Sequence, residues 1–151
     1  MKSWINMLRV RHWVKNLMLF FPLFLGCLLT DTEVFGSGVI PFSAFCLASS
    51  STYIFNDLVD APKDAKHPVK KERPIAAGEI SLMAGVVSAV GLAILALVLA
   101  IQVGGVFLWI LIGYASLSII YTLKLKDIAV VDLFCISIFF ILPLEAGGQA
   151  F

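Results

Sequence analysis

The sequence carries little charge for its length. Of its 151 residues, 14% are charged and 60% are hydrophobic, whereas soluble globular chains carry about 25% charged residues. Between Glu79 and Lys124 there is no Asp, Glu, Lys or Arg. As one helix, this segment would be about 66 Å long, roughly twice the hydrocarbon thickness of a bilayer. The composition therefore excludes a soluble domain and predicts two membrane spans here, joined by a turn at residues 102–105.

Cysteine is scarce as well. The three cysteines, Cys27, Cys46 and Cys135, lie in apolar stretches, without CxxC spacing and without a nearby histidine. This pattern indicates buried apolar side chains, not a disulfide or a cysteine metal site. The net charge of +1 gives no indication of a nucleic-acid partner, and none is expected.

Five apolar segments are long enough to be membrane-spanning helices, at residues 13–30, 39–57, 80–101, 105–122 and 128–146. The predicted fold class is all-α, a polytopic transmembrane helical bundle that forms one domain over residues 1–151. The first segment lacks a small-x-small cleavage site, so we interpret it as a retained span and not as a signal peptide. The sequence ends just after the fifth segment without a polar tail, which suggests a fragment of a longer protein.

The Lys and Arg residues alternate with the expected spans. All 11 lie at or before the start of the first span, in the 58–79 loop, or between the fourth and fifth spans. The loops at 31–38 and 102–104 contain none. Because cytoplasmic loops are enriched in Lys and Arg, we expect the N-terminus and both basic loops in the cytoplasm, with the protein in a bacterial-type inner membrane.

Three aspartates follow the second expected span. Asp57, Asp60 and Asp64 have i, i+3 and i+7 spacing, so on a helix their carboxylates share one face. Anions are unfavourable at a helix C-terminus, and a divalent cation would offset both this effect and their mutual repulsion. Oxygen ligands of this kind suit Mg²⁺, which often bridges carboxylates to substrate phosphates. The alternatives are a solvated acidic helix end neutralised by lysines, and an early helix end at Pro62 that leaves Asp64 in a loop.

The stretch from residue 66 to residue 78 is basic. It contains Lys66, His67, Lys70 and Arg73. It could be an ordinary cytoplasmic loop attracted to anionic lipid headgroups. Its position directly after the aspartates equally favours a phosphate clamp, in which Lys acts as a point charge and Arg as a fork.

A third polar group surrounds the start of the last expected span. It contains Tyr121, Lys126, Asp127 and Asp132. Asp132 lies about one turn inside an apolar segment, where a charge is expensive and usually functional. Asp127 and Asp132 are five residues apart and diverge by about 140° on a regular helix, so they are not expected to share a face.

These motifs resemble those of the UbiA-type superfamily of membrane prenyltransferases. Asn56-Asp57-x-x-Asp60-x-x-x-Asp64 is similar to the first aspartate-rich motif of that family. The segment from Arg9 to Asn16, which reads RVRHWVKN, and the His67-Pro68-x-Lys70-x-x-Arg73-Pro74 motif are similar to its decaprenyl-phosphate phosphoribosyltransferase branch. The second family motif is represented only by Lys126 and Asp132, without a regular Asp-x-x-x-Asp. The resemblance implies the N-terminal half of a nine-helix fold whose aspartates hold Mg²⁺ and a diphosphate.

The resemblance also implies a reaction, the transfer of phosphoribose from phosphoribosyl diphosphate to a polyprenyl phosphate. The residues expected to take part are catalytic Asp57, Asp60, Lys126 and Asp132; substrate-binding Lys15, Asn16, Asn56, Lys66, His67, Lys70, Arg73 and Tyr121; and Mg²⁺ ligands Asp57, Asp60 and Asp64. One alternative is an aromatic prenyltransferase that uses a polyprenyl diphosphate. Another is a non-catalytic membrane subunit or small transporter with a lipid-binding basic loop. The oligomeric state is not predicted.

Overall fold

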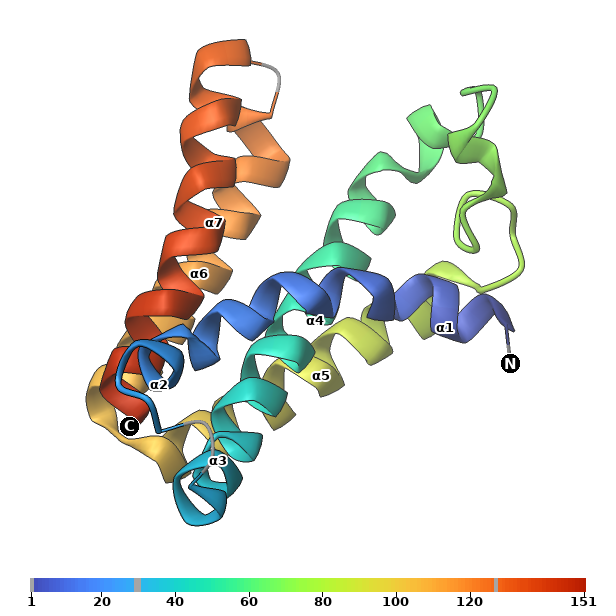
Figure 1. The fold of residues 1–151 in the computed structure, drawn as a ribbon. Helices are drawn as coiled ribbons and strands as arrows, with labels where there is room; N and C mark the ends of the chain where they lie inside the picture. Colours follow the sequence, from blue (N-terminus) through green and yellow to red (C-terminus); the bar gives the residue numbers. More distant parts are fainter. Residues whose placement is uncertain (1, 29–30, 127) are drawn as a thin grey trace.

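The computed structural model describes residues 2–28, 31–126 and 128–151. This part of the chain consists of helices and turns without a β-strand (Figure 1), so the predicted all-α class is confirmed. The elements in chain order are α1 (Lys2–Leu8), the 3₁₀ helix η1 (Val10–Phe20), α2 (Phe21–Leu25), α3 (Thr32–Ser37), α4 (Val39–Asp64), the 3₁₀ turn η2 (Lys70–Glu72), α5 (Leu82–Val103), α6 (Gly105–Ile120), the π-helical turn η3 (Tyr121–Leu125) and α7 (Ala129–Ala150).

Four helical stretches are long and apolar enough to cross a membrane. They are Thr32–Asp64, Leu82–Val103, Gly105–Leu125 and Val130–Ala150. Each overlaps one of the last four expected spans. The expected loop at 58–79 is shorter than predicted, because α4 continues to Asp64 with Pro62 inside its last turn. The protein is therefore an integral membrane protein with a helical bundle.

The first expected span, at 13–30, has a different structure. Its described residues form the end of η1 and the five-residue α2, and none of the four candidate spans includes them. Polar and apolar side chains alternate around η1, where Asn16 is fully buried and Val14 and Leu17 are exposed. Because η1 points polar side chains into the protein, it lacks the all-round apolar surface of an ordinary lipid-facing helix. The membrane crossing of 13–30 stays a prediction.

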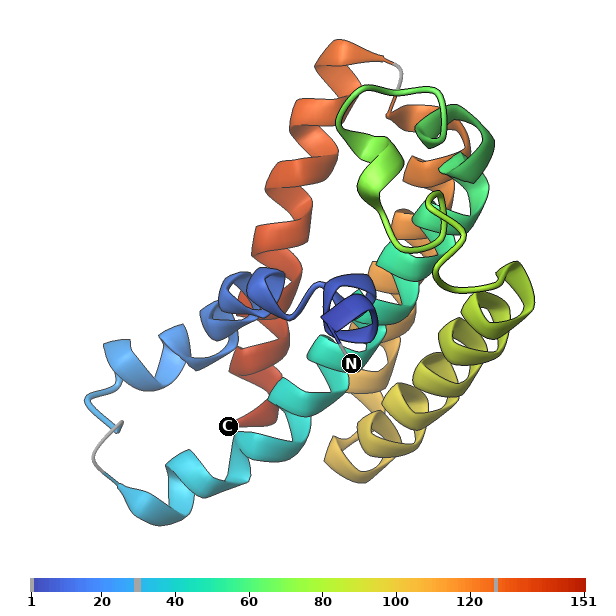
Figure 2. The ribbon, with the colours of Figure 1, turned by 90° about the vertical axis from the view of Figure 1, so that its right-hand side faces the viewer.

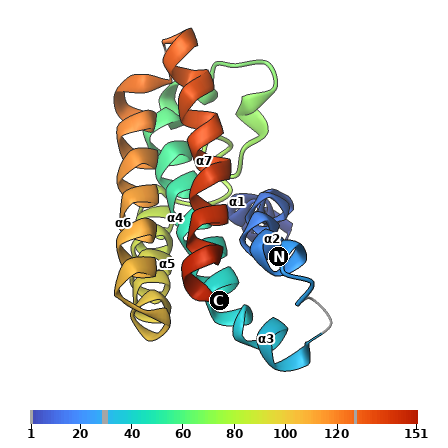
Figure 3. The same cartoon turned by 60° about the vertical axis from the view of Figure 1, so that its left-hand side comes forward.

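The four long helices lie side by side, and the segment from α1 to α2 packs on one side of them, against α4 and α7 (Figure 3). The most extensive contact joins α4 and α5. Small side chains on α4 allow this close approach, and the Ser51 hydroxyl donates a hydrogen bond to the Ala89 carbonyl of α5 at 2.8 Å. Trp13 of η1 donates to the Ser50 hydroxyl at 3.0 Å, which fixes the N-terminal segment against α4.

A sharp turn separates α5 from α6. Gly104 has a φ angle of 146°, which glycine adopts readily because it has no Cβ. The turn lies within the expected 102–105 segment. It directs α6 back along α5 toward the end of the bundle where the basic segments lie.

The loop after α4 and the α6–α7 connection lie at the same end of the bundle (Figures 1 and 2). Ile75 and Ile80 of the loop are 6% and 4% exposed and pack with Met7 and Ile54 in an apolar cluster. This cluster anchors the loop to α4 and α1. The basic residues of the loop are thereby held near the C-terminal end of α4.

Candidate functional site

An open cavity of about 1100 Å³ is bordered by η1, the C-terminal half of α4, the loop after α4, the C-terminal half of α6, η3 and α7. Its lining includes two carboxylates, those of Asp60 and Asp64. The seven basic residues in the lining are Arg9, Arg11, Lys15, Lys63, Lys70, Arg73 and Lys126. An excess of positive charge in a partly desolvated cleft attracts and concentrates anions. The lining therefore has the charge of a site for anionic ligands.

The aspartates of α4 lie on one side of the helix and are largely withdrawn from solvent. Asp57, Asp60 and Asp64 are 3%, 9% and 3% exposed. Asp64 is the last residue of α4, so it belongs to the helix and not to the following loop. Because anions at a helix C-terminus are unfavourable, buried carboxylates here need positive partners. Each of the three has at least one.

Asp57 accepts hydrogen bonds from two arginines. The Arg9 Nη2 lies 2.5 Å and the Arg73 Nη1 3.1 Å from the Asp57 Oδ1. The Arg9 guanidinium also lies 4.9 Å from the centre of the Tyr53 ring. Asp57 is not among the residues that line the cavity, whereas both arginines are. Its carboxylate thus lies behind the arginines and orients them.

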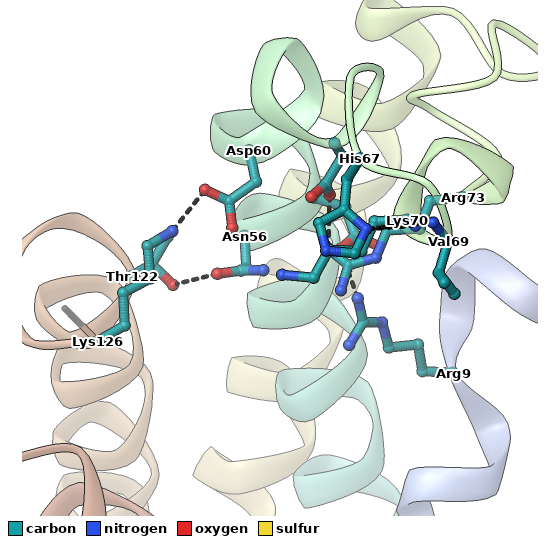
Figure 4. Close-up of polar contacts among 11 residues, drawn as sticks. Arg9, Asn56, Asp60, His67, Val69, Lys70, Arg73, Thr122 and Lys126 are labelled. Carbon is teal, nitrogen blue, oxygen red and sulfur yellow. Dashed lines mark hydrogen bonds and ion pairs between the residues drawn. The ribbon is translucent and has the colours of Figure 1, made fainter. Parts of the chain in front are cut away.

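Asp64 shares one of these arginines. The Arg73 Nη1 lies 2.6 Å from the Asp64 Oδ2, so one guanidinium joins both ends of the acidic face. Figure 4 shows Arg9 and Arg73 approaching α4 from the same side, on which they converge from below and from above. Together these contacts hold the N-terminal segment and the loop against the same helix.

Asp60 pairs with the opposite wall of the cavity. The Lys126 Nζ lies 2.5 Å from the Asp60 Oδ1, and the Thr122 hydroxyl donates to the Asn56 Oδ1 at 3.3 Å (Figure 4). Both partners come from the turn after α6, where the Lys126 amide donates to the Tyr121 carbonyl in a π-helical turn. Such turns often occur at functional sites. This one connects the expected second-motif residue Lys126 to the first motif.

His67 orders the start of η2. Its Nδ1 accepts hydrogen bonds from the backbone amides of Val69 and Lys70, each at 3.2 Å. An accepting Nδ1 places the proton of the neutral ring on Nε2. His67 and Lys70 both line the cavity, so the contact fixes the backbone from which the Lys70 side chain extends.

His12 lies beside the same cations and stacks on Tyr53, with 5.3 Å between ring centres. Burial lowers the pKa of His12 below its ordinary value of 6.5, and the positive charges of Arg9 and Lys15 lower it further. Both effects favour the neutral ring.

The acidic face of α4 is the candidate place for Mg²⁺ in this structure. Within the described ranges, no three His, Cys, Asp or Glu side chains gather closely enough to hold a metal together, because Asp60 turns toward Lys126 while Asp57 and Asp64 turn toward Arg73. Asn56, Asp60 and Asp64, which carry oxygen donors, nevertheless line the cavity. Mg²⁺ commonly binds one or two carboxylates together with waters and substrate phosphates. This set of donors fits such an ion.

Most of the predicted site residues line the cavity, and a few do not. Those in its lining are Lys15, Asn56, Asp60, Asp64, His67, Lys70, Arg73, Tyr121 and Lys126. Lys66 is exposed outside the cavity, and Asn16 is buried against Cys46, with 3.5 Å between its Nδ2 and the Cys46 Sγ. Asp132 lies behind Tyr121, whose hydroxyl donates to its Oδ1 at 2.7 Å.

Several cavity residues were not predicted as site residues. They include Arg9, Arg11, Tyr53, Tyr114 and Thr122. Arg9 and Arg11 belong to the RVRHWVKN segment, so that resemblance contained the signal. Tyr114 sits in an apolar stretch, and nothing in the sequence distinguishes it from a core aromatic residue.

Four apolar helical stretches, three of which border a cationic cavity, define an integral membrane protein with a cavity whose charge suits anions. The chain belongs to the UbiA prenyltransferase family, which residues 19–151 match. It is 36% identical over 152 residues to the decaprenyl-phosphate phosphoribosyltransferase of Corynebacterium glutamicum, covering 97% of this chain and 45% of that protein. It is 34% identical over 142 residues to nodulation protein NoeC of Azorhizobium caulinodans, covering 94% and 46%.

The fold is also that of known UbiA structures. A UbiA homolog from Archaeoglobus fulgidus, whose structure holds GPP and Mg²⁺, superimposes with a TM-score of 0.80 at 21% identity, covering 96% of this chain and 52% of the other. The chain thus spans about half the length of these proteins. It contains the first aspartate-rich motif and the turn that carries Lys126.

Proposed function

We propose that this chain forms part of a Mg²⁺-dependent transferase that moves phosphoribose from phosphoribosyl diphosphate to a polyprenyl phosphate. The observation that carries the proposal is the excess of basic over acidic side chains in a cavity bounded by membrane helices. Two phosphate-bearing substrates require such a charge, and one of them requires contact with the bilayer. The relatives named decaprenyl-phosphate phosphoribosyltransferase support the choice.

In the proposed reaction, Lys70, Arg73 and Lys126 bind the diphosphate of phosphoribosyl diphosphate. An oxygen of the lipid phosphate forms a bond to C1 of the ribose as the bond from C1 to the diphosphate oxygen breaks. The diphosphate leaves with the bonding electrons, and the three cations stabilise its growing negative charge. The lipid phosphate is already an anion, so no general base is needed.

Asn56, Asp60 and Asp64 would hold the Mg²⁺. When bound, the ion supplies Lewis-acid stabilisation of the diphosphate. The carboxylates also position the cations, because Asp60 contacts Lys126 and Asp64 contacts Arg73. Asp57 contributes by orienting Arg9 and Arg73. We further propose that the cavity faces the cytoplasm, since Lys and Arg are enriched in cytoplasmic loops.

The test uses membranes that contain this chain, alone or extended by the C-terminal half of the C. glutamicum relative. Each preparation receives phosphoribosyl diphosphate labelled in the ribose and a polyprenyl phosphate, with Mg²⁺ or with a chelator. The expected result is Mg²⁺-dependent label in the lipid extract. Label that enters the lipid equally with chelator would contradict the metal requirement.

A variant and its control, made in whichever preparation is active, test whether Asp60 holds the metal. Asp60→Asn is expected to abolish Mg²⁺-dependent transfer, because a carboxamide is a weaker ligand and does not pair with Lys126. Asp31→Asn is the matched control: Asp31 caps α3 away from the cavity, and Asn is an equally good cap. Full activity of Asp60→Asn would refute the proposed role of Asp60.

The same membranes test the alternative function, that of an aromatic prenyltransferase. They would receive a labelled prenyl diphosphate and an aromatic acceptor in place of the first pair of substrates. Transfer to the aromatic ring, without transfer of phosphoribose, would replace the proposed reaction by prenyl transfer.

A further inference from the structure

Lys15 occupies an unusual place in the cavity. Its Nζ donates to the Tyr114 hydroxyl oxygen at 3.1 Å. It also lies 5.0, 5.5 and 5.7 Å from the ring centres of Tyr53, Tyr114 and Phe139. In the part of the chain that the structure describes, the four ion pairs involve other cations, and no carboxylate lies within 4.0 Å of this ammonium. Aromatic rings stabilise a desolvated ammonium, but they leave its positive charge without an anionic partner.

The surroundings of Lys15 differ from those of Arg73 and Lys126. Val14 and Met18 flank it on η1, and Ile136, Phe139 and Phe140 of α7 complete an apolar wall. Arg73 and Lys126 instead lie among carboxylates near the C-terminal end of α4. Along α4, Tyr53 beside Lys15 and Asp60 beside Lys126 are seven residues apart, which corresponds to about 10 Å of helix. The cavity thus contains a cationic region among carboxylates and a second one, around Lys15, that is bordered by apolar side chains. Arg9 connects the two, because it lies over the same Tyr53 ring as Lys15 and pairs with Asp57.

We propose that Lys15, positioned by Tyr114, binds the phosphate head of an isoprenoid monophosphate, at a subsite separate from the diphosphate site. The proposal rests on the proposed function, for which it identifies the acceptor site. A single ammonium matches a single phosphate group through charge-assisted hydrogen bonds. The apolar wall beside it matches the first isoprene units of the tail.

The subsite suits the chemistry of the transfer. The acceptor phosphate enters as an anion, and Lys15 would hold it by charge without taking or giving a proton. The phosphate oxygen can then form its bond to C1 while the diphosphate leaves from the Lys126 region with the bonding electrons. Lys15 would in this way bring two mutually repelling anions into one cavity.

A binding experiment on the wild-type chain tests the separation of the two subsites. The chain is placed in phosphatidylcholine nanodiscs with Mg²⁺ and titrated with labelled farnesyl phosphate, a short isoprenoid monophosphate. The affinity is measured without and with saturating phosphoribosyl diphosphate. Both ligands are expected to bind together, with the farnesyl phosphate affinity changed by no more than about threefold. Full competition would show one shared anion site and overturn the proposal.

Variants of Lys15 test its role in binding the phosphate group. Lys15→Met keeps the length and apolar stem of the side chain, and it is expected to weaken farnesyl phosphate binding at least about tenfold, the loss of one charge-assisted contact. Its affinities for farnesol, which has the tail without the phosphate, and for phosphoribosyl diphosphate are expected to stay near the wild-type values. Lys15→Arg, which keeps the charge, is expected to retain most of the farnesyl phosphate affinity. Lys124→Met is the control, because Lys124 is exposed outside the cavity.

The outcomes separate this proposal from the proposed function. If phosphoribosyl diphosphate binds and Lys15→Met keeps its affinity for farnesyl phosphate, the subsite is wrong and the proposed function stands. If farnesyl phosphate binding depends on Lys15 but phosphoribosyl diphosphate does not bind, the subsite stands and the proposed function is wrong. An equal loss of farnesol and farnesyl phosphate affinity in Lys15→Met would indicate a packing defect and overturn the role of the charge.

Discussion

The Arg9 guanidinium reaches from the N-terminal segment to the Asp57 carboxylate of α4, with 2.5 Å between Nη2 and Oδ1. Arg9 has a φ angle of 50°, a left-handed conformation that costs a residue with a Cβ about 1–2 kcal/mol. Such conformations persist where surrounding contacts determine them. The contact with Asp57 provides one such constraint, and the bend at Arg9 lies where α1 ends and η1 begins.

The first prediction concerns Asp57. Asp57→Asn keeps the shape of the side chain but leaves Arg9 and Arg73 without its negative charge. Breaking a fully buried ion pair costs about 3–5 kcal/mol. The side chains of Arg9 and Arg73 are 19% and 25% exposed, so solvent weakens these pairs. The expected loss of unfolding free energy is therefore smaller, about 2 kcal/mol. Unfolding by denaturing detergent in mixed micelles measures the difference.

Glu79→Gln is the control for this change, since it removes one carboxylate from an exposed loop position outside the cavity lining. It is expected to change the unfolding free energy by less than about 0.5 kcal/mol. Equal stability of Asp57→Asn and Glu79→Gln would show that Asp57 does not hold the two arginines in place.

The acidic face illustrates what the sequence could predict. The i, i+3, i+7 spacing of Asp57, Asp60 and Asp64 predicted one shared face, and the helix continues through Pro62, so that all three are buried together. Helical periodicity is a local property, which makes such a prediction possible. The partners are not local: Arg9 and Asp57 are 48 residues apart, and Lys126 and Asp60 are 66 apart. Only the folded chain identifies these pairs.

The membrane spans show the same difference between what local sequence signals predict and what they do not. Long apolar runs predicted the regions of α4 to α7, because such runs give the strongest signal of membrane helices. The N-terminal run gave the same signal over residues 17–29, but η1 also contains Lys15, whose Nζ contacts Tyr114 on α6. Hydropathy alone does not report that contact, so neither the 3₁₀ form of η1 nor its place across the bundle was predicted.

The second prediction concerns the packing of η1 against α7. A Cβ atom added at Gly147 of α7 would overlap the carbonyl oxygen of Leu19 on η1. A backbone atom cannot rotate away as a side chain can, so Gly147→Ala must separate the two helices. The expected result is a loss of about 1–3 kcal/mol in unfolding free energy, typical of overpacking. The same detergent unfolding measurement applies.

Gly148→Ala provides a matched control. It is the same substitution one residue later in α7, where an added Cβ meets no described atom within 4 Å. Alanine has a higher helix propensity than glycine, so this variant is expected to be as stable as the wild type or slightly more stable. If both variants behave alike, the close approach of Leu19 and Gly147 does not contribute to the packing.

The third prediction concerns pH and His12, whose pKa is lowered from 6.5 first by burial and then by the charges of Arg9 and Lys15. Between this lowered value and 6.5, the unfolded chain binds a proton that the folded protein does not bind. The unfolding free energy therefore falls as the pH is lowered through 6.5, and His12 contributes no slope above that range. His12→Gln, which does not titrate, is expected to reduce the difference in unfolding free energy between pH 7.5 and pH 5.5. An unchanged difference in this variant would mean that His12 titrates alike in the folded and unfolded states, and that Arg9 and Lys15 do not act on it.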